Sequence, residues 1–285
     1  HAHAGSAAVS AGDGSYEPDR MAGGAEGEMQ RLEAQAGLTG AKELFLLEAL
    51  GVGADDHIVE VGAGSGAFSR MLVDRFPAAD FTLIEPDTQM RELLRRDLTP
   101  RAAISTGSAE AIPLESNCAD VVIARFVYQH LRRPVDAARE ALRVLRPGGR
   151  LIVIDFDGQL WGLSEPYNDA NSGIHSRVFE SQRERGGDRF IGRKLTRILA
   201  EAGCESVELF PFASSSDEVG VEAFMALTKP DNLLPHLETG LISIQEYARV
   251  VSDHERLLED PDALMIALGF LCTGTAPGSA HSLSG

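Results

Sequence analysis

The sequence is poor in cysteine, poor in basic residues and free of long apolar runs. Its 285 residues include three cysteines, Cys118, Cys204 and Cys272, whose scatter suits neither a disulfide framework nor a metal site. Free thiols are typical of a reducing compartment, so we expect a cytoplasmic protein. No stretch reaches the roughly 18 apolar residues that a membrane helix needs, and we expect no secretory signal.

Basic residues are also outnumbered, because 26 Lys and Arg stand against 43 Asp and Glu and give a net charge of −17. We therefore expect neither a nucleic-acid partner nor binding to an anionic membrane surface, since both require a basic face. The composition, 44% hydrophobic and 24% charged, is typical of a globular protein. A small molecule is the expected partner, and self-association to a homodimer stays open.

The first residues, HAHAGS, look like a cloning remnant, and the stretch rich in glycine and alanine that follows carries no core pattern. We predict that residues 1–20 are a tag remnant and a mobile N-terminus. Residues 21–285 are predicted to form a single domain, with a first helix that starts near Glu28 and ends before Gly51.

Beyond residue 56, short apolar runs alternate with amphipathic segments, which indicates βαβ units around a mostly parallel sheet. The predicted strands are residues 57–62, 80–85, 102–106, 119–124, 150–156, 204–210 and 264–274. The predicted helices among them are residues 67–76, 88–96, 134–145 and 191–203. Residues 158–188 and 217–262 break the alternation. We therefore predict an α/β protein, a seven-stranded sheet flanked by helices, with helical insertions in those two segments.

Three glycines, Gly62, Gly64 and Gly66, stand between the first predicted strand and its helix. Glycine lets the backbone turn sharply and lets a ligand approach the main chain. Glu85 ends the next strand, where a carboxylate can accept both hydroxyls of a ribose. The pattern therefore predicts a ribose-containing ligand without saying which one, and a tight turn with no ligand is the alternative. Glu60 favours a cationic ligand over a pyrophosphate.

Five successive segments resemble the motifs of class I S-adenosylmethionine-dependent methyltransferases, most closely the small-molecule and quinone-biosynthesis branch. They are VEVGAGSGAF (59–68), LIEPDTQM (83–90), GSAEAIPL (107–114), ADVVIARFVYQHL (119–131) and RVLRPGGRLIVIDFD (143–157). The resemblance is close over about residues 55–157. It implies a Rossmann-like fold, S-adenosylmethionine as cofactor and S-adenosylhomocysteine as product. The two insertions would then form a lid over the methyl acceptor.

The resemblance also implies a set of cofactor contacts. The residues are Tyr16, Arg31, Gln35, Glu60, Gly62, Ala63, Gly64, Glu85, Pro86, Met90, Ser108, Ala109, Glu110 and Arg125. Glu85 would bind the ribose hydroxyls, and Pro86 and Met90 would cover the adenine, with a plain core position as the alternative for Met90. Ser108 stands where related proteins often carry Asp, so it would accept from the adenine amino group without charge assistance. Arg125 would pair either with the cofactor carboxylate or with a local acid.

Ligands of such sheets bind beyond the carboxyl ends of the strands, so the acceptor is expected near residues 125–131 and 155–161 and under the first insertion. The candidate catalytic residues are His175, Asp157, His130 and Tyr128. The candidate acceptor-binding residues are Gln129, Trp161, Tyr167 and Asn168. Each candidate has a structural alternative: a helix-entry position for His130, a satisfied or solvated lid histidine for His175, a turn cap for Asp157 and a core position for Tyr128. No His and Asp spacing fits a metal site, so we predict metal-free chemistry.

The predicted function is methyl transfer to oxygen, nitrogen or carbon of a small acceptor, which we expect to belong to secondary metabolism. The same cofactor site would serve an enzyme that keeps the methyl group and promotes a cyclisation, elimination or rearrangement. A cofactor-sensing subunit without activity is a further alternative. A nicotinamide oxidoreductase is another, although no hydride-transfer constellation follows the glycine loop.

Overall fold

A computed structural model describes residues 24–167 and 170–278. The predicted tag remnant and mobile N-terminus, together with Tyr16 and Asn168, lie outside the described residues. The strands are β1 His57–Val61, β2 Asp80–Ile84, β3 Ala103–Ser105, β4 Ala119–Arg125, β5 Leu145–Glu165, β6 Glu205–Ser215 and β7 Leu264–Thr275. The first six helices are α1 Gly24–Ala49, α2 Ala67–Arg75, α3 Thr88–Leu98, α4 Pro134–Val144, α5 Ala170–Glu184 and α6 Leu195–Ala202. The remaining helices are α7 Ser216–Val219, α8 Val221–Leu227, α9 Leu234–Glu238 and α10 Ile244–Glu259.

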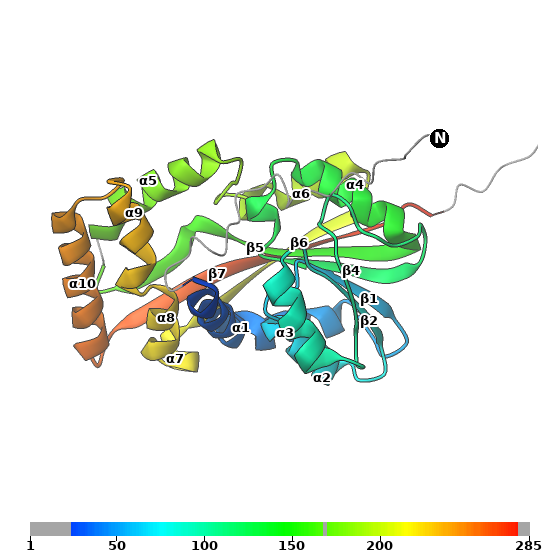
Figure 1. The fold of residues 1–285 in the computed structure, drawn as a ribbon, viewed down its shortest axis with the longest axis horizontal. Helices are drawn as coiled ribbons and strands as arrows, with labels where there is room; N and C mark the ends of the chain where they lie inside the picture. The colour runs from blue at the N-terminus through cyan, green and yellow to red at the C-terminus, as the bar shows by residue number, and fades with distance from the viewer. Residues whose placement is uncertain (1–23, 168–169, 279–285) are drawn as a thin grey trace, which may run out of the picture.

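The strands of the described chain form one seven-stranded sheet in the order β3-β2-β1-β4-β5-β7-β6 (Figure 1). Strands β1 to β5 pair in parallel, and β7 runs antiparallel between β5 and β6. The prediction of a seven-stranded, mostly parallel α/β sheet is confirmed. Its strand order reverses at β1 and β4, so their carboxyl ends open onto the crevice in which doubly wound sheets bind ligands.

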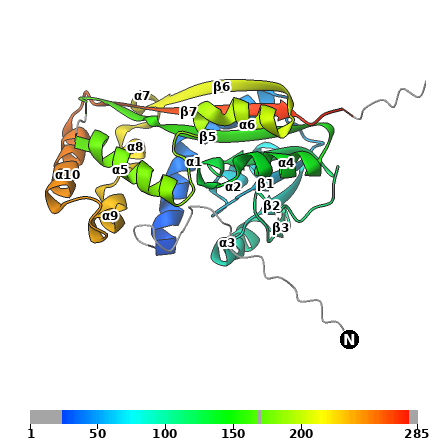
Figure 2. The same cartoon turned by 90° about the horizontal axis from the view of Figure 1, so that it is seen from above.

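The central strands are apolar on both faces, because helices cover both sides of the sheet (Figure 2). In β4, Val121 and Ile123 pack in the core cluster that contains side chains of α1, α2 and α3. Val122 and Ala124 join the opposite cluster, with side chains of α4 and α6. Alternate residues of one strand therefore serve two cores, which explains why the sequence shows unbroken apolar runs here.

The residues that begin the helices fix the length of the connections between each strand and the helix that follows it. The Asp87 side chain accepts the backbone N–H of Met90 at 2.9 Å, so α3 begins almost directly after β2 and leaves a short connection that contains Glu85. Pro134 opens α4 in the same way, since its missing N–H is one that a first helical turn leaves unpaired. These short connections hold polar residues at the carboxyl edge of the sheet.

The long outer strands differ from the predicted boundaries. Strand β5 continues past residue 156 to Glu165, and β6 continues to Ser215, because β7 offers both of them a partner along its whole length. The pairing of β5 with β7 shifts register between Phe156 and Trp161. Helices α5 and α7 to α10 follow these extensions and gather at one end of the sheet, at the left in Figure 1.

The helices at this end have small cores of their own. One cluster joins Ile174 of α5 to Ile242 and Val250, which lie before and within α10. A second joins Leu38 of α1 to Phe224 and Met225 of α8. We call α5 and α8 to α10, with their connections, the cap.

Candidate active site

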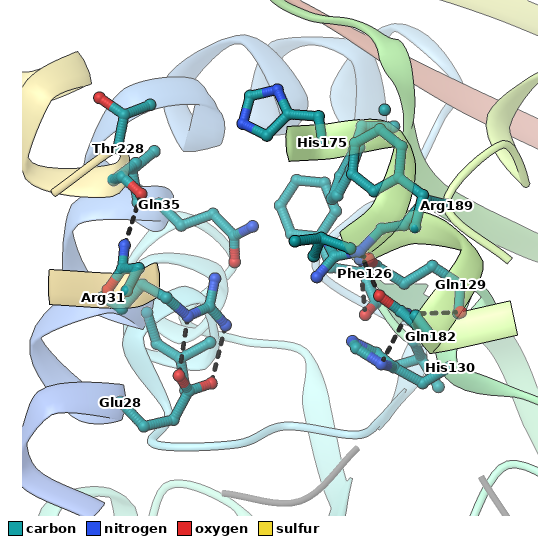
Figure 3. A pocket seen from close by; sticks show the side chains of 18 of the residues that line it. Glu28, Arg31, Gln35, Phe126, Gln129, His130, His175, Gln182, Arg189 and Thr228 are labelled. Atoms are coloured by element: carbon teal, nitrogen blue, oxygen red, sulfur yellow. Dashed lines mark hydrogen bonds and ion pairs between the residues drawn. The ribbon is translucent and has the colours of Figure 1, made fainter. Parts of the chain in front are cut away.

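A cavity of about 1360 Å³ lies at the carboxyl edge of the parallel strands, between α1, the strand ends and the cap. Residues that follow β1, β2 and β4 line one end of it, and cap residues line the other. Figure 3 shows Glu28, Arg31 and Gln35 of α1 facing a group around Arg189 across this space. Single small-ligand pockets measure about 300–1,000 Å³, so this cavity has room for two molecules.

The glycine loop forms the floor of the first end. Gly62, Gly64 and Gly66 have φ values of 74°, 55° and 80°, in the left-handed region that other residues rarely adopt. A Cβ at Gly62 would lie 2.5 Å from Val127 Cγ2, and a Cβ at Gly64 would lie 3.2 Å from Leu32. Conformation favours glycine at all three positions, and space also excludes a side chain at Gly62, so the loop backbone stays open to the cavity.

Glu85 is buried at the end of β2 and lines the cavity. Its carboxylate accepts the backbone N–H groups of Gly64 and Asp87, each at 2.8 Å. Burial raises its pKa to about 7, and these two N–H donors limit the rise. A carboxylate fixed in this way ties the glycine loop to β2 and still has lone pairs that can accept hydroxyl groups from a ligand.

Glu60, in β1, is a second buried carboxylate on this wall. It accepts the hydroxyl of Ser69, and burial raises its pKa to about 7 in spite of that hydrogen bond. Neither Glu60 nor Glu85 forms an ion pair with another described residue, so this end of the cavity suits a cationic ligand with hydroxyl groups.

Arg125 lines the cavity but is already paired. Its Nε lies 2.5 Å from Glu43 Oε2, and both side chains are buried. The guanidinium also stacks between the rings of Phe68 and Phe126, 4.7 Å and 4.4 Å from their centres. Of the two predicted partners, the structure shows the local acid. The pair ties α1 to the end of β4 and so fixes the wall of the site.

The remaining predicted cofactor contacts divide into two groups. Arg31, Gln35, Ala63, Pro86, Ser108, Ala109 and Glu110 all line the cavity. Met90 does not: its side chain is 1% exposed in the interior, which is the core alternative and a correction to the predicted adenine contact. Glu110 lies 3.5 Å from Arg133, and Arg31 is paired with Glu28 at 2.7 Å.

Two of the four candidate catalytic residues, Tyr128 and Asp157, do not line the cavity. Tyr128 is fully buried in the core cluster that contains Leu195 and Cys272, and burial raises the pKa of its hydroxyl. Asp157 is buried as well, and Arg193 Nη2 donates to its Oδ1 at 2.7 Å, so the pair ties β5 to the turn before α6. Neither residue lines the cavity, because their side chains face the protein interior.

The two candidate histidines do line it. His130 Nδ1 lies 3.5 Å from Gln182 Nε2, and burial lowers its pKa well below the ordinary value, with Arg189 as a further cause. His175 stacks on the ring of Phe179 at 5.7 Å, and burial lowers its pKa too. Both imidazoles are therefore neutral at pH 7 and able to accept a proton.

Two of the four predicted acceptor-binding residues, Gln129 and Tyr167, line the cavity. Gln129 lines the cavity, and its Oε1 accepts from Arg189 Nη1 at 2.8 Å. Tyr167 lines the rim and is 71% exposed. Trp161 lies in β5, and its side chain is not among the described parts of the structure. Asn168 lies outside the described residues altogether.

Sequence reasoning missed several residues of the site. Glu43 carries no signal beyond being an acid on the inner face of α1. Asp155, at the end of the apolar run IVIDF, is fully buried and accepts the backbone N–H groups of Gln129 and Phe156, each at 3.0 Å. Burial raises its pKa to about 7. Arg189 is the third, and its position follows from the fold of the cap alone.

Among the residues described, no group of three or more His, Cys, Asp or Glu side chains could hold a metal ion. Within the same residues, none of the helices combines the length and the apolar character that crossing a membrane requires.

Comparison with known proteins identifies the class. A family model described as a methyltransferase domain matches residues 59–153. A malonyl-[acyl-carrier protein] O-methyltransferase from Geobacter sulfurreducens is 33% identical over 176 residues, which are 61% of this chain and 64% of that protein. A ubiquinone/menaquinone biosynthesis C-methyltransferase from Paracoccus denitrificans is 34% identical over 105 residues, 35% of this chain and 42% of that protein.

A solved structure has a similar arrangement. Phosphoethanolamine N-methyltransferase 2 from Haemonchus contortus, in complex with S-adenosyl-L-methionine, aligns with a TM-score of 0.53 at 17% identity over 83% of this chain and 52% of that chain. At this identity the match concerns the fold.

The chain therefore carries a methyltransferase domain of the class I S-adenosylmethionine-dependent family, as its motifs predicted. Within that class it is similar to the small-molecule branch, and S-adenosylmethionine is the cofactor of the class. The chain spans 64% and 47% of the two malonyl-[acyl-carrier protein] O-methyltransferases that it matches.

Proposed function

We propose that the protein transfers the methyl group of S-adenosylmethionine to a small-molecule acceptor. The observation that carries the proposal is the division of one cavity into two ends. The first end holds the glycine loop and two buried carboxylates, Glu60 and Glu85, and the second lies under the cap. A cofactor and an acceptor can therefore lie side by side in a space shielded by α1 and the cap.

The residues at the first end fit the cofactor. Glu85 is positioned to accept ribose hydroxyls, and the open backbone of Gly62 and Gly64 leaves room for the methionine part. Glu60 lies on the same wall and favours positive charge. Ser108, Ala109 and Pro86 would border the adenine. When bound, S-adenosylmethionine supplies an electrophilic methyl group on a positively charged sulfur.

The protein would contribute mainly position and exclusion of water. Holding two reactants in line turns a bimolecular step into one within a complex, which is worth up to about 7–11 kcal/mol. A base is needed only where the acceptor arrives protonated. His130 and His175 are the candidates, because both line the cavity and their depressed pKa values leave them neutral. The proposed location is a reducing, cytoplasmic compartment, in keeping with the free thiols of Cys118, Cys204 and Cys272.

Calorimetry with S-adenosylmethionine, S-adenosylhomocysteine and NAD tests the cofactor. We expect binding of the two sulfur compounds and none of NAD. Incubation with methyl-labelled S-adenosylmethionine and a panel of phenols, amines and carboxylic acids, followed by mass spectrometry, tests the transfer. A product heavier by one methyl group, formed with S-adenosylhomocysteine, is expected. A product of rearranged mass without the methyl group would instead support a cyclisation or elimination, and absence of cofactor binding would refute the proposal.

A further inference from the structure

The carboxylates that line the cavity are confined to one of its ends, where the two lining arginines, Arg31 and Arg125, are each paired with an acid of α1. All the carboxylates among the lining residues, Glu28, Glu60, Glu85 and Glu110, come from α1, from β1 or from the loops after β2 and β3. The described lining residues from Phe156 to Met265 include no carboxylate. They do include four cations and three histidines, namely Arg185, Arg189, Arg193, Lys229, His175, His236 and His254. The chain as a whole has a net charge of −17, so the positive charge of this end is opposite in sign to that of the protein.

The four cations are not equivalent. Arg193 is neutralised by Asp157, and Arg185 and Lys229 are exposed, so water solvates them. Arg189 is partly buried on the cavity wall. Within residues 24–167 and 170–278, it forms no ion pair with a carboxylate. Asp155 is the acid that acts on it most, from a position in which both carboxylate oxygens accept backbone N–H groups.

Neutral groups fix the Arg189 guanidinium in place. Its Nη1 donates to Gln129 Oε1 at 2.8 Å, and its Nε donates to Gln182 Oε1 (Figure 3). Its carbon lies 5.3 Å from the centre of the Phe156 ring. These contacts orient the planar cation without cancelling its charge. Burial lowers the Arg189 pKa to about 10, the positive charge of Arg31 lowers it further, and the charges of Asp155 and Glu28 oppose that fall.

Aromatic side chains lie beside this cation. The rings of His175 and Phe179 stack at 5.7 Å, and Phe179 meets Phe190 edge to face at the same separation. All three residues line the cavity. The cap end therefore combines one oriented guanidinium, which forms no ion pair within the described residues, with an apolar wall, and this suits an anion attached to an apolar body.

We infer that the methyl acceptor carries an anionic group, a carboxylate or a phosphate, which docks on Arg189 while its apolar part lies against the Phe179 and Phe190 rings. The inference rests on the proposed function, because it names the substrate class of the same cavity. Guanidinium and these anions share a planar or forked hydrogen-bond geometry, and a charge-assisted bond is stronger than a neutral one.

Calorimetry on the full chain saturated with S-adenosylhomocysteine tests it. The probes are 3-phenylpropanoate, phenyl phosphate and the neutral 3-phenylpropanamide. We expect at least one anion to bind at least about tenfold more tightly than the amide. Comparison of the two anions shows whether the carboxylate or the phosphate is preferred. Arg189→Gln should abolish the preference and leave the S-adenosylhomocysteine affinity unchanged, and Arg189→Lys, which keeps the charge, should retain part of it.

Arg139→Gln is the matched control, because it removes one positive charge from the exposed surface of α4. It should bind all probes as the unchanged protein does. Three results would overturn the inference: equal affinity for amide and anions, an anion preference that survives in Arg189→Gln, or no heat from either anion up to about 10 mM. S-adenosylhomocysteine is titrated first. If it does not bind, the proposed function fails; if it binds and the anions are not preferred, only this inference fails.

Discussion

Replacing Glu85 with Gln is expected to flatten the pH dependence of stability and to weaken cofactor binding. Glu85 is 3% exposed, and burial raises its pKa to about 7. The N–H groups of Gly64 and Asp87 offset part of that cost. Because the carboxyl holds its proton more tightly in the folded protein than in the unfolded chain, folding takes up a proton at intermediate pH.

The sign and size follow from linkage. A carboxyl with a raised folded pKa contributes stability that is present at low pH and is lost as the pH rises from its unfolded value to its folded value. With pKa values of 4.5 and about 7, Glu85 alone lowers the free energy of unfolding by about 1.4 kcal/mol between about pH 6 and about pH 8.5. Glutamine does not titrate, so the variant lacks this contribution. The range stays above the sequence pI of about 4.8, near which the net charge vanishes and solubility falls.

Urea denaturation at both pH values measures the difference. We compare the unchanged protein, Glu85→Gln and Glu115→Gln, which removes the same charge from an exposed position. Asp155 titrates in the same range in all three proteins, so its contribution cancels. The charge of Glu85 contributes to the raised pKa of Glu60, so Glu85→Gln also removes that smaller part of the Glu60 contribution, in the same direction. Glu115→Gln should follow the unchanged protein. Equal slopes in the unchanged protein and in Glu85→Gln would refute the assignment of a raised pKa to Glu85.

Calorimetry with S-adenosylmethionine at about pH 8.5 completes the test. Loss of a hydrogen bond to a charged group costs about 1.5–3 kcal/mol, so Glu85→Gln should bind at least about tenfold more weakly. Unchanged affinity would show that Glu85 does not contact the cofactor.

Three further changes examine other parts of the site. Glu43→Ala should lower the free energy of unfolding in urea by about 3–5 kcal/mol, because it leaves the buried Arg125 without its partner; a loss below about 1 kcal/mol would mean a solvated pair. Tyr128→Phe keeps the ring in the core, so kcat for methyl transfer should stay within about twofold, and a large fall would return Tyr128 to the catalytic candidates. Gly62→Ala sets a Cβ 2.5 Å from Val127 at a positive φ, and should cost about 1–3 kcal/mol of stability; an unchanged melting temperature would show that the loop relaxes freely.

The parallel half of the sheet could be predicted from the sequence, because its signals are local. Strands such as β4 are apolar on both faces, and glycine, proline and aspartate mark their ends. The cofactor end of the site follows from the same signals, since Glu60, the glycine loop and Glu85 all stand directly at strand ends. Parallel pairing then brings those ends together.

The acceptor end could not be predicted, because there the chemistry depends on which way a side chain points. Tyr128 and Gln129 are neighbours in one short turn, yet one is in the core and the other lines the cavity. Asp157 is paired with Arg193, 36 residues further on, and sequence spacing does not predict a contact at that distance. Within the cap, α8 and α9 are short, and several residues face a cavity rather than a core, so the sequence pattern does not define these elements.

The position of β7 has a consequence for synthesis. It is the last strand of the described chain, and it lies inside the sheet, bonded to β5 on one side and to β6 on the other. Until residues 264–275 leave the ribosome, β5 and β6 each present an unpaired edge. The sheet and the cap attached to it are therefore completed only after β7 has been synthesised, while the cofactor half assembles earlier. The excess of carboxylates gives growing chains the same sign of charge and so keeps those open edges apart.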